Sequence, residues 1–208
     1  MTGSIFFKTQ LKAILRASRY GKVKILYPMI SSLEEIRKAH SILKEVKREL
    51  DAAGKEYDRG IEAGIMIEVP AAAVIADQLA KEVDFFSIGT NDLVQYLIAV
   101  DRMNEQIAHM YNPYQPSVFR MLRYTIESAK AAGIPVTVCG ELAGDPRALP
   151  LWLGLGIEEL SMSAHSILTV KERLLGSDAR SCVRLLPEVL SCRTSEEIVA
   201  LLDSVKCQ

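Results

Sequence analysis

Three short apolar runs each end on a side chain that can bind a metal or move a proton. The run Gly-Ile-Met-Ile-Glu ends on Glu68, and Phe-Phe-Ser-Ile-Gly-Thr-Asn-Asp ends on Asn91 and Asp92. The third run, Pro-Val-Thr-Val-Cys, ends on Cys139 and is followed by a glycine. Near-continuous apolar runs are typical of buried parallel strands. Functional side chains at the carboxyl ends of such strands indicate an α/β barrel with its active site at that end.

Glu68 and Asp92 are the candidates for a metal site. A carboxylate at the end of a buried strand is costly unless something compensates its charge, and we expect both carboxylates at one barrel mouth. Mg²⁺ prefers few protein carboxylates, several waters and the oxygens of a phosphorylated substrate. Each residue also has a structural interpretation, in which Glu68 caps the helix after Pro70 and Asp92 begins the next helix. As a pair they favour magnesium.

Asn91, Arg102 and Cys139 are the candidates for substrate binding and proton transfer. The amide of Asn91 can donate to an anionic oxygen, and the guanidinium of Arg102 suits a phosphate or carboxylate. A thiol with an ordinary pKa of about 8.5 is mostly protonated near neutrality and can give a proton to carbon. The alternatives are a turn asparagine, a surface arginine and a small buried cysteine. Glu141 is either a further member of the site or a helix cap.

The remaining cysteines and histidines offer weaker signals. Cys182 falls in an amphipathic helical pattern and is predicted to pack in the core, whereas Cys192 and Cys207 have no defined setting. Without a Cys-x-x-Cys pair or a zinc-ligand spacing, we expect reduced thiols. His109 and His165 are minor candidates for the border of the site.

Strands alternate with helices along the chain, which predicts a parallel α/β sheet. Predicted strands lie at 23–28, 63–68, 84–89, 135–139 and 159–163. Predicted helices lie at 5–18, from Ser31 or Ser32 to Gly54, and at 71–82, 92–100, 117–132, 146–154, 166–175, 178–190 and 194–206. A closed barrel of this type has eight strands. The sequence therefore predicts either an open doubly wound sheet or a partial (β/α)8 barrel of the TIM type that lacks its first strands.

Length and composition limit the classes of function. The chain has 208 residues, of which 49% are hydrophobic, and its net charge is −1. We expect one domain, residues 1–208, with a large core. The charge balance gives no footprint for nucleic acid, and no apolar stretch reaches the roughly 20 residues of a membrane span. We expect a cytoplasmic protein.

Six motifs in this order resemble one enzyme family. They are Phe-Lys-Thr-Gln-Leu-Lys-Ala-Ile-Leu-Arg-Ala-Ser, Tyr-Pro-Met-Ile, Met-Ile-Glu-Val-Pro-Ala-Ala-Ala, Asp-Phe-Phe-Ser-Ile-Gly-Thr-Asn-Asp-Leu-Val-Gln-Tyr, Ala-Val-Asp-Arg and Cys-Gly-Glu-Leu-Ala-Gly-Asp. The chain from about residue 6 onward resembles the C-terminal, phosphoenolpyruvate-binding domain of enzyme I of the bacterial phosphoenolpyruvate:sugar phosphotransferase system.

The resemblance implies a role for each candidate residue. Glu68 and Asp92 would bind Mg²⁺, Asn91, Asp92 and Arg102 would contact phosphoenolpyruvate, and Cys139 would protonate the enolpyruvate carbon. In that family a histidine on a separate domain takes the phosphoryl group and passes it to the carrier protein HPr, and the C-terminal domain forms a homodimer. The phosphohistidine domain, the HPr-binding domain and the first barrel strands are not in this sequence. The resemblance therefore favours a partial barrel that cannot complete the reaction alone.

Two other functions fit the same residues. The chain could be a fragment of a pyruvate phosphate dikinase or phosphoenolpyruvate synthase-like enzyme, which shares several of these motifs. It could also be a non-catalytic dimerisation module, because an open barrel exposes apolar strand surface that favours self-association.

Overall fold

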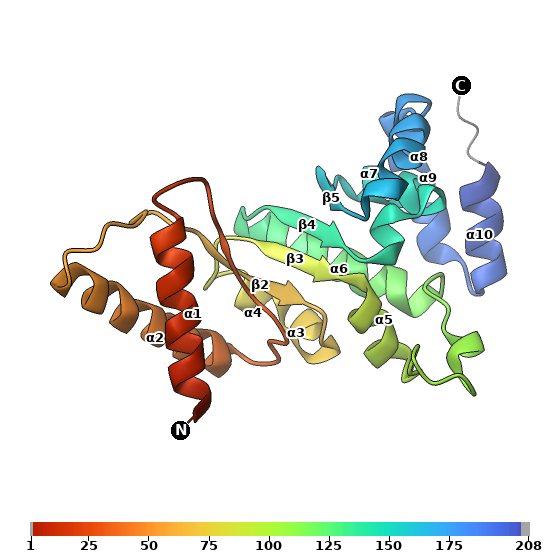
Figure 1. The fold of residues 1–208 in the computed structure, drawn as a ribbon. Helices are drawn as coiled ribbons and strands as arrows, with labels where there is room; N and C mark the ends of the chain where they lie inside the picture. Colours follow the sequence, from red (N-terminus) through yellow and green to blue (C-terminus); the bar gives the residue numbers. More distant parts are fainter. Residues whose placement is uncertain (1, 205–208) are drawn as a thin grey trace.

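A single parallel sheet forms the centre of the computed structural model, which describes residues 2–204 (Figure 1). Its strands, in the order β1-β2-β3-β4-β5, are β1 Ile25–Tyr27, β2 Ala63–Ile67, β3 Phe86–Gly89, β4 Val136–Cys139 and β5 Glu159–Ser161. Each strand pairs in parallel with the next one along the chain. A doubly wound sheet reverses its strand order at a switch point. The unbroken order is instead that of an arc of a (β/α)8 barrel.

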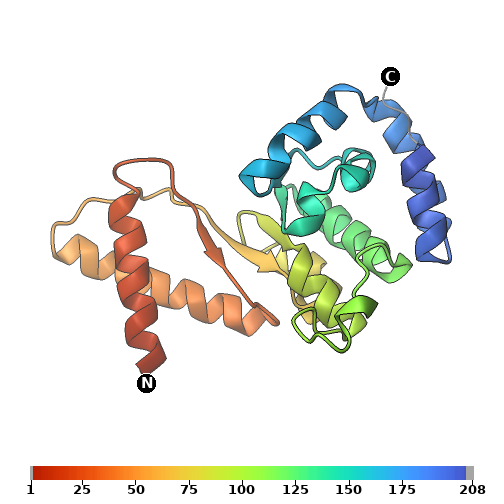
Figure 2. The ribbon, with the colours of Figure 1, turned by 45° about the vertical axis from the view of Figure 1, so that its right-hand side comes forward.

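Helices connect and flank the strands. The α-helices are α1 Thr2–Ala17, α2 Leu33–Ala52, α3 Pro70–Val74, α4 Ala76–Leu79, α5 Thr90–Ile98, α6 Pro116–Ala132, α7 Leu149–Leu155, α8 Ala164–Leu175, α9 Ala179–Ser191 and α10 Ser195–Ser204. Three short 3₁₀ helices are η1 Ala108–Met110, η2 Glu141–Gly144 and η3 Pro146–Ala148. The pair α1 and α2 lies at the β1 end of the sheet, and α7 to α10 gather at the β5 end (Figure 2). Among residues 2–204, no helix combines the length and apolar character needed to cross a membrane.

Local sequence signals explain several helix ends. Ser32 caps α2, and its hydroxyl accepts from the backbone N–H of Glu35 while the Glu35 carboxylate returns to the Ser32 backbone. This reciprocal capping box satisfies two helix donors. Pro116 occupies the first turn of α6, where a missing N–H costs nothing, and Gly133 ends the helix at a φ of 73°. The predicted helix beginning at Ser31 or Ser32 is thus confirmed with Ser32 as its cap.

Some predicted elements differ from the observed ones. The predicted helix 71–82 is two short helices, α3 and α4, because Ile75 between them departs from helical geometry at φ −107° and ψ 23°. Pro150 lies in the first turn of α7. The sequence suggested that Pro150 bends a helix, but a proline in the first turn does not do so. The prediction for Cys207 falls outside the described residues.

The two faces of the sheet differ. One face is buried against the helices and carries Tyr27, Ile65 and Phe86, which stand in register with one another. The other face, which is the interior face of a closed barrel, carries the exposed Leu26 and the half-buried Cys139. The described part of the chain supplies five strands, so this interior face is only partly covered. The candidate site lies on it, at the carboxyl ends of the strands.

Candidate active site at the carboxyl ends of the strands

The predicted strand-end residues lie side by side at the edge of the interior face. Cys139 is in register with Gly89 on one side and with Ser161 on the other. Glu68 follows the last residue of β2 and neighbours Gly89, since a Cβ built on that glycine would lie 3.1 Å from the Glu68 Cβ. We call Glu68, Gly89, Cys139 and Ser161 the end row. It brings a carboxylate and a thiol from two different strands onto one edge.

Glu68 is a buried carboxylate with only 4% of its surface exposed. Its Oε1 atom accepts a hydrogen bond of 2.7 Å from the backbone N–H of Met29, which itself adopts a left-handed φ of 55°. Burial raises the pKa of Glu68, the Met29 N–H lowers it, and the neighbouring Asp92 carboxylate raises it further. The Glu68 side chain therefore binds the turn that follows β1 and does not cap the helix that begins at Pro70, whose N-cap is Val69.

Asp92 and Arg102 form a loose charged group beside Glu68. Asp92 lies in the first turn of α5, and its Oδ1 is 3.8 Å from the Arg102 guanidinium. The other end of that guanidinium lies 3.7 Å from the Glu141 carboxylate. These half-exposed contacts are worth little as salt bridges. The Arg102 guanidinium can therefore reorient toward an anion. Glu141 is linked to Asp92 through its contact with the same guanidinium.

Glu68 and Asp92 form a donor set that fits magnesium. Among residues 2–204, no cluster of three or more His, Cys, Asp or Glu side chains could hold a metal ion. Structural zinc needs four ligands and catalytic zinc usually three. Glu68 and Asp92 are neighbouring carboxylates, and Asp92 raises the pKa of Glu68. Such a pair suits Mg²⁺, which keeps several waters and shares substrate oxygens.

The turn after β3 is fastened to the turn after β4. The buried Thr90 hydroxyl donates to the Cys139 carbonyl across 2.8 Å, and Asn91 Oδ1 accepts from the Glu141 N–H across 2.9 Å. The amide oxygen of Asn91 is therefore already used in this contact. Its NH₂ group remains as the donor toward a ligand. Gly140 lies between these contacts at a φ of 99°.

Replacing Gly140 by alanine is expected to lower the free energy of unfolding by about 2–4 kcal/mol. The added Cβ would lie 2.4 Å from Thr90 Oγ1 and 2.8 Å from Asn91 Oδ1, in a backbone region that only glycine adopts readily. Urea unfolding measures the loss. Gly133→Ala is the matched control, because Gly133 also has a positive φ but its Cβ would meet nothing within 4 Å. Equal losses in both variants would contradict the clash.

Cys139 has the surroundings of a protonated thiol. Its sulfur lies 3.7 Å from the Ser87 hydroxyl and 3.5 Å from the Ile88 carbonyl oxygen. Burial raises the pKa of the thiol, the Ser87 hydrogen bond lowers it, and the Glu68 and Asp92 charges raise it further. A neutral thiol at neutral pH is what a proton donor to carbon requires.

A cavity of about 580 Å³ opens beside the end row. Cys139, Asn91 and Glu141 line it, together with His165 and Ser166 at the start of α8. His165 thus borders the predicted site, whereas His109 lies in η1 within the long connection before α6. The volume suits a small-molecule ligand.

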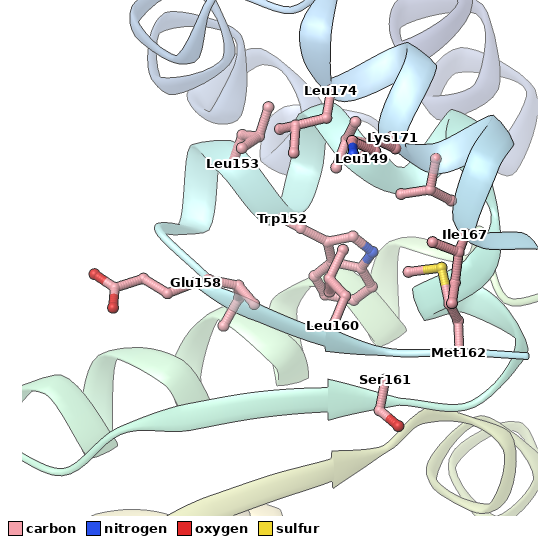
Figure 3. Close-up of a pocket in the computed structure, with 12 residues that line it drawn as sticks. Leu149, Trp152, Leu153, Glu158, Leu160, Ser161, Met162, Ile167, Lys171 and Leu174 are labelled. Carbon is pink, nitrogen blue, oxygen red and sulfur yellow. The ribbon is translucent and has the colours of Figure 1, made fainter. Parts of the chain in front are cut away.

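A larger cavity of about 770 Å³ lies between β5 and the helices α7 and α8 (Figure 3). Its walls are mostly apolar side chains of α7, β5 and α8, including Trp152, Leu160 and Ile167. Ser161 and Met162 line both cavities. Of the site residues predicted from the sequence, Asn91 and Cys139 line the smaller cavity.

Sequence reasoning missed four residues that hold the site together. Met29 binds Glu68, Thr90 binds the Cys139 carbonyl, Ser87 contacts the Cys139 sulfur, and Tyr111 donates to the Asn91 carbonyl across 3.2 Å. Burial raises the pKa of Tyr111 to about 12, so its hydroxyl stays a donor. Met29, Ser87 and Thr90 lie inside the motifs that carry the family resemblance, and Tyr111 lies outside them. Their contacts were not predicted, because they depend on strand register and turn geometry.

The strand order indicates part of a parallel α/β barrel, in which a carboxylate and a thiol lie on one edge at the strand ends. The chain belongs to the family described as PEP-utilising enzyme, PEP-binding domain, whose sequence profile matches residues 2–179. The family resemblance expected from the motifs is thereby confirmed.

Curated relatives are similar over nearly the whole chain. A phosphoenolpyruvate-protein phosphotransferase of Listeria monocytogenes is 52% identical over 197 residues, which are 95% of this chain and 34% of the relative. Proteins of the same name from Bacillus subtilis and from Lactococcus lactis subsp. cremoris are each 49% identical over 94% and 97% of this chain. The chain spans about a third of the length of these relatives.

A solved structure supports the barrel fold independently. A citrate lyase from Burkholderia xenovorans superposes with a TM-score of 0.58 over 94% of this chain and 66% of that chain, at 15% sequence identity. Its fold is TIM-barrel-like. The prediction of a barrel-family α/β fold is confirmed, and the doubly wound alternative is not supported by the strand order.

Proposed function

We propose that this chain is the phosphoenolpyruvate-binding portion of a phosphoenolpyruvate-protein phosphotransferase. The observation that carries the proposal is the end row, which sets the Glu68 carboxylate and the Cys139 thiol on one edge next to the Asn91 amide. The family match and the names of the relatives support it.

The proposed mechanism assigns one task to each group. Glu68 and Asp92 hold Mg²⁺, which when bound neutralises charge on substrate oxygens. Arg102 and the NH₂ group of Asn91, together with Asp92, position phosphoenolpyruvate. Loss of the phosphoryl group breaks the P–O bond and leaves the enolate of pyruvate. Cys139 then gives its proton to C3, the C2 carbonyl forms, and the negative charge passes from the enolate to sulfur.

The acceptor of the phosphoryl group lies elsewhere in this proposal. A histidine on another domain of a longer polypeptide takes it and passes it to HPr, so the 208-residue chain alone does not complete the transfer. Residues 1–208 form a single barrel domain whose remaining strands come from the same longer polypeptide. The apolar cavity beside the edge strand β5 (Figure 3) is where an added strand and helix would pack. Because phosphoenolpyruvate is a metabolite of central carbon metabolism, we place the protein in the cytoplasm.

Calorimetric titration with phosphoenolpyruvate tests the proposed function. We expect binding in the presence of Mg²⁺ and at least about tenfold weaker binding in EDTA, because the metal and substrate share ligands. The titration is done on the 208-residue chain and on the full-length protein. Absence of phosphoenolpyruvate binding to the full-length protein with Mg²⁺ would refute the proposal.

Self-association is a second proposed property, favoured by exposed apolar side chains. Phe6 and Ile5 on α1 are 78% and 68% exposed, and Leu168 on α8 is 77% exposed. Such side chains favour a homodimer. Light scattering measures the mass of the protein in solution and so tests for the dimer.

A dimer that lacks affinity for phosphoenolpyruvate and Mg²⁺ would favour the dimerisation module over the enzyme portion. A nucleotide-binding domain in the longer polypeptide would favour a dikinase or synthase.

A further inference from the structure

Ser87 is a buried polar residue directly behind the thiol of the proposed proton donor. It lies within β3, is 6% exposed, and stands in register with Thr137, two residues before Cys139 on β4. Side chains two residues apart on a strand point to the same face. Ser87 therefore faces the barrel interior one step deeper than the end row, and it is diagonal to Cys139.

Two contacts from β3 hold the Cys139 sulfur in one place. The Ser87 hydroxyl donates to the sulfur across 3.7 Å, and the thiol donates to the Ile88 carbonyl oxygen across 3.5 Å. A thiol has a single heavy-atom torsion, so two contacts from one strand are enough to select its rotamer. The sulfur stays at the wall of the cavity that Asn91 and Glu141 also line.

The Ser87 contact changes in strength during the proposed reaction. Before proton transfer the hydroxyl donates to a neutral sulfur, which is a weak acceptor. Afterwards the S–H bond has broken, a C–H bond has formed at C3, and the electron pair remains on sulfur as a thiolate. Hydrogen bonds to an ionised acceptor are about twice as strong as neutral ones. An interaction that strengthens along the reaction accelerates it.

We propose that Ser87 is a positioning residue for Cys139, which fixes the thiol rotamer and then donates to the sulfur as it gives up its proton. The orienting part rests only on the contacts described here. The catalytic part rests on the proposed function. The alternative is that Ser87 is merely a small residue that fits the interior of the sheet, which predicts that its hydroxyl is dispensable.

Alkylation of Cys139 tests the contact without any substrate. The chain is treated with iodoacetamide across a pH series, and the modified Cys139 peptide is quantified by mass spectrometry. In Ser87→Ala we expect the midpoint of alkylation to move up by about 0.5–1 pH unit, because the forming thiolate loses a donor. Ser87→Thr retains a hydroxyl and is expected to restore the midpoint. Ser128→Ala, at a buried serine of α6, is the control for loss of a buried hydroxyl.

Thermal unfolding of each variant separates this role from a packing role. We expect Ser87→Ala to unfold within about 2 °C of the wild type, since it deletes one oxygen. An unchanged alkylation midpoint in Ser87→Ala would overturn the proposal. A midpoint in Ser87→Thr that shifts as far as the one expected for Ser87→Ala would also overturn it, and this second variant keeps the test decisive if the alanine variant is unstable.

Exchange of the pyruvate C3 protons with deuterium in the full-length protein tests the catalytic part. Ser87→Ala is expected to lower kcat by about tenfold with little change in KM, because the lost hydrogen bond acts on a charged group. A wild type without exchange activity but with a Ser87-dependent alkylation midpoint would refute the proposed function and support the orienting contact. A Ser87→Ala variant with wild-type kcat would overturn the catalytic part.

Discussion

Replacing Cys139 by alanine abolishes exchange of the pyruvate C3 protons in the full-length protein, with an expected loss of about 10²- to 10⁴-fold. The thiol is the proposed acid, and its raised pKa keeps it protonated at neutral pH. Cys139→Ser is expected to lose activity nearly as far, because a hydroxyl is a much weaker acid than a thiol and its shorter bond withdraws the donor from the cavity. Proton NMR of pyruvate in deuterated buffer measures the exchange.

Binding provides the control for the Cys139 variants. Phosphoenolpyruvate and Mg²⁺ are held by other residues in the proposed site, so we expect affinity in Cys139→Ala to stay within about threefold of the wild type. Loss of exchange with intact binding assigns the proton transfer to Cys139. Exchange that persists in Cys139→Ala would show that another group supplies the proton. His165, which lines the same cavity, would then be the next candidate.

The strand ends were the most predictable part of this molecule. The apolar runs predicted the five strands of the described sheet. Glu68 and Cys139 lie at the same edge because parallel strands share a direction. Burial is the main cause of the raised pKa of Glu68, and the Asp92 carboxylate lies near enough to raise it further. These predictions needed only the apolar pattern of each strand and the polar residue at the end of that strand.

The supporting contacts could not be predicted, because they depend on register and on backbone torsion. Ser87 meets Cys139 only because Gly89 and Cys139 are partners in the sheet. Met29, in the turn after β1, reaches Glu68 through a left-handed backbone that its residue type does not favour. Ile75 looked helical from its apolar neighbours and instead separates α3 from α4.

Replacing Glu68 by glutamine is expected to stabilise the metal-free protein while removing its response to magnesium. The ionised carboxylate is buried beside Asp92, and its raised pKa means that its charged form weakens the fold. Glutamine retains an oxygen for the Met29 N–H and carries no charge. We expect a gain of about 0.5–2 kcal/mol in the free energy of unfolding at neutral pH, measured by urea titration in EDTA. Glu158→Gln, at an exposed position, is the control and is expected to change nothing.

The pH dependence of that gain gives the prediction its sign. A carboxyl with a raised pKa binds its proton more tightly in the folded state, so the wild type recovers stability as the pH falls through that pKa. The stability advantage of Glu68→Gln should therefore be complete above the raised pKa and vanish below the pKa of the unfolded state.

Magnesium should reverse the order of stability of the two proteins at neutral pH. The wild-type carboxylates bind it and thereby stabilise the folded state, whereas glutamine contributes a weaker ligand. Equal stabilisation of both proteins by Mg²⁺ and phosphoenolpyruvate would remove Glu68 from the metal site, and the strand-end carboxylates would then need another explanation for their shared edge.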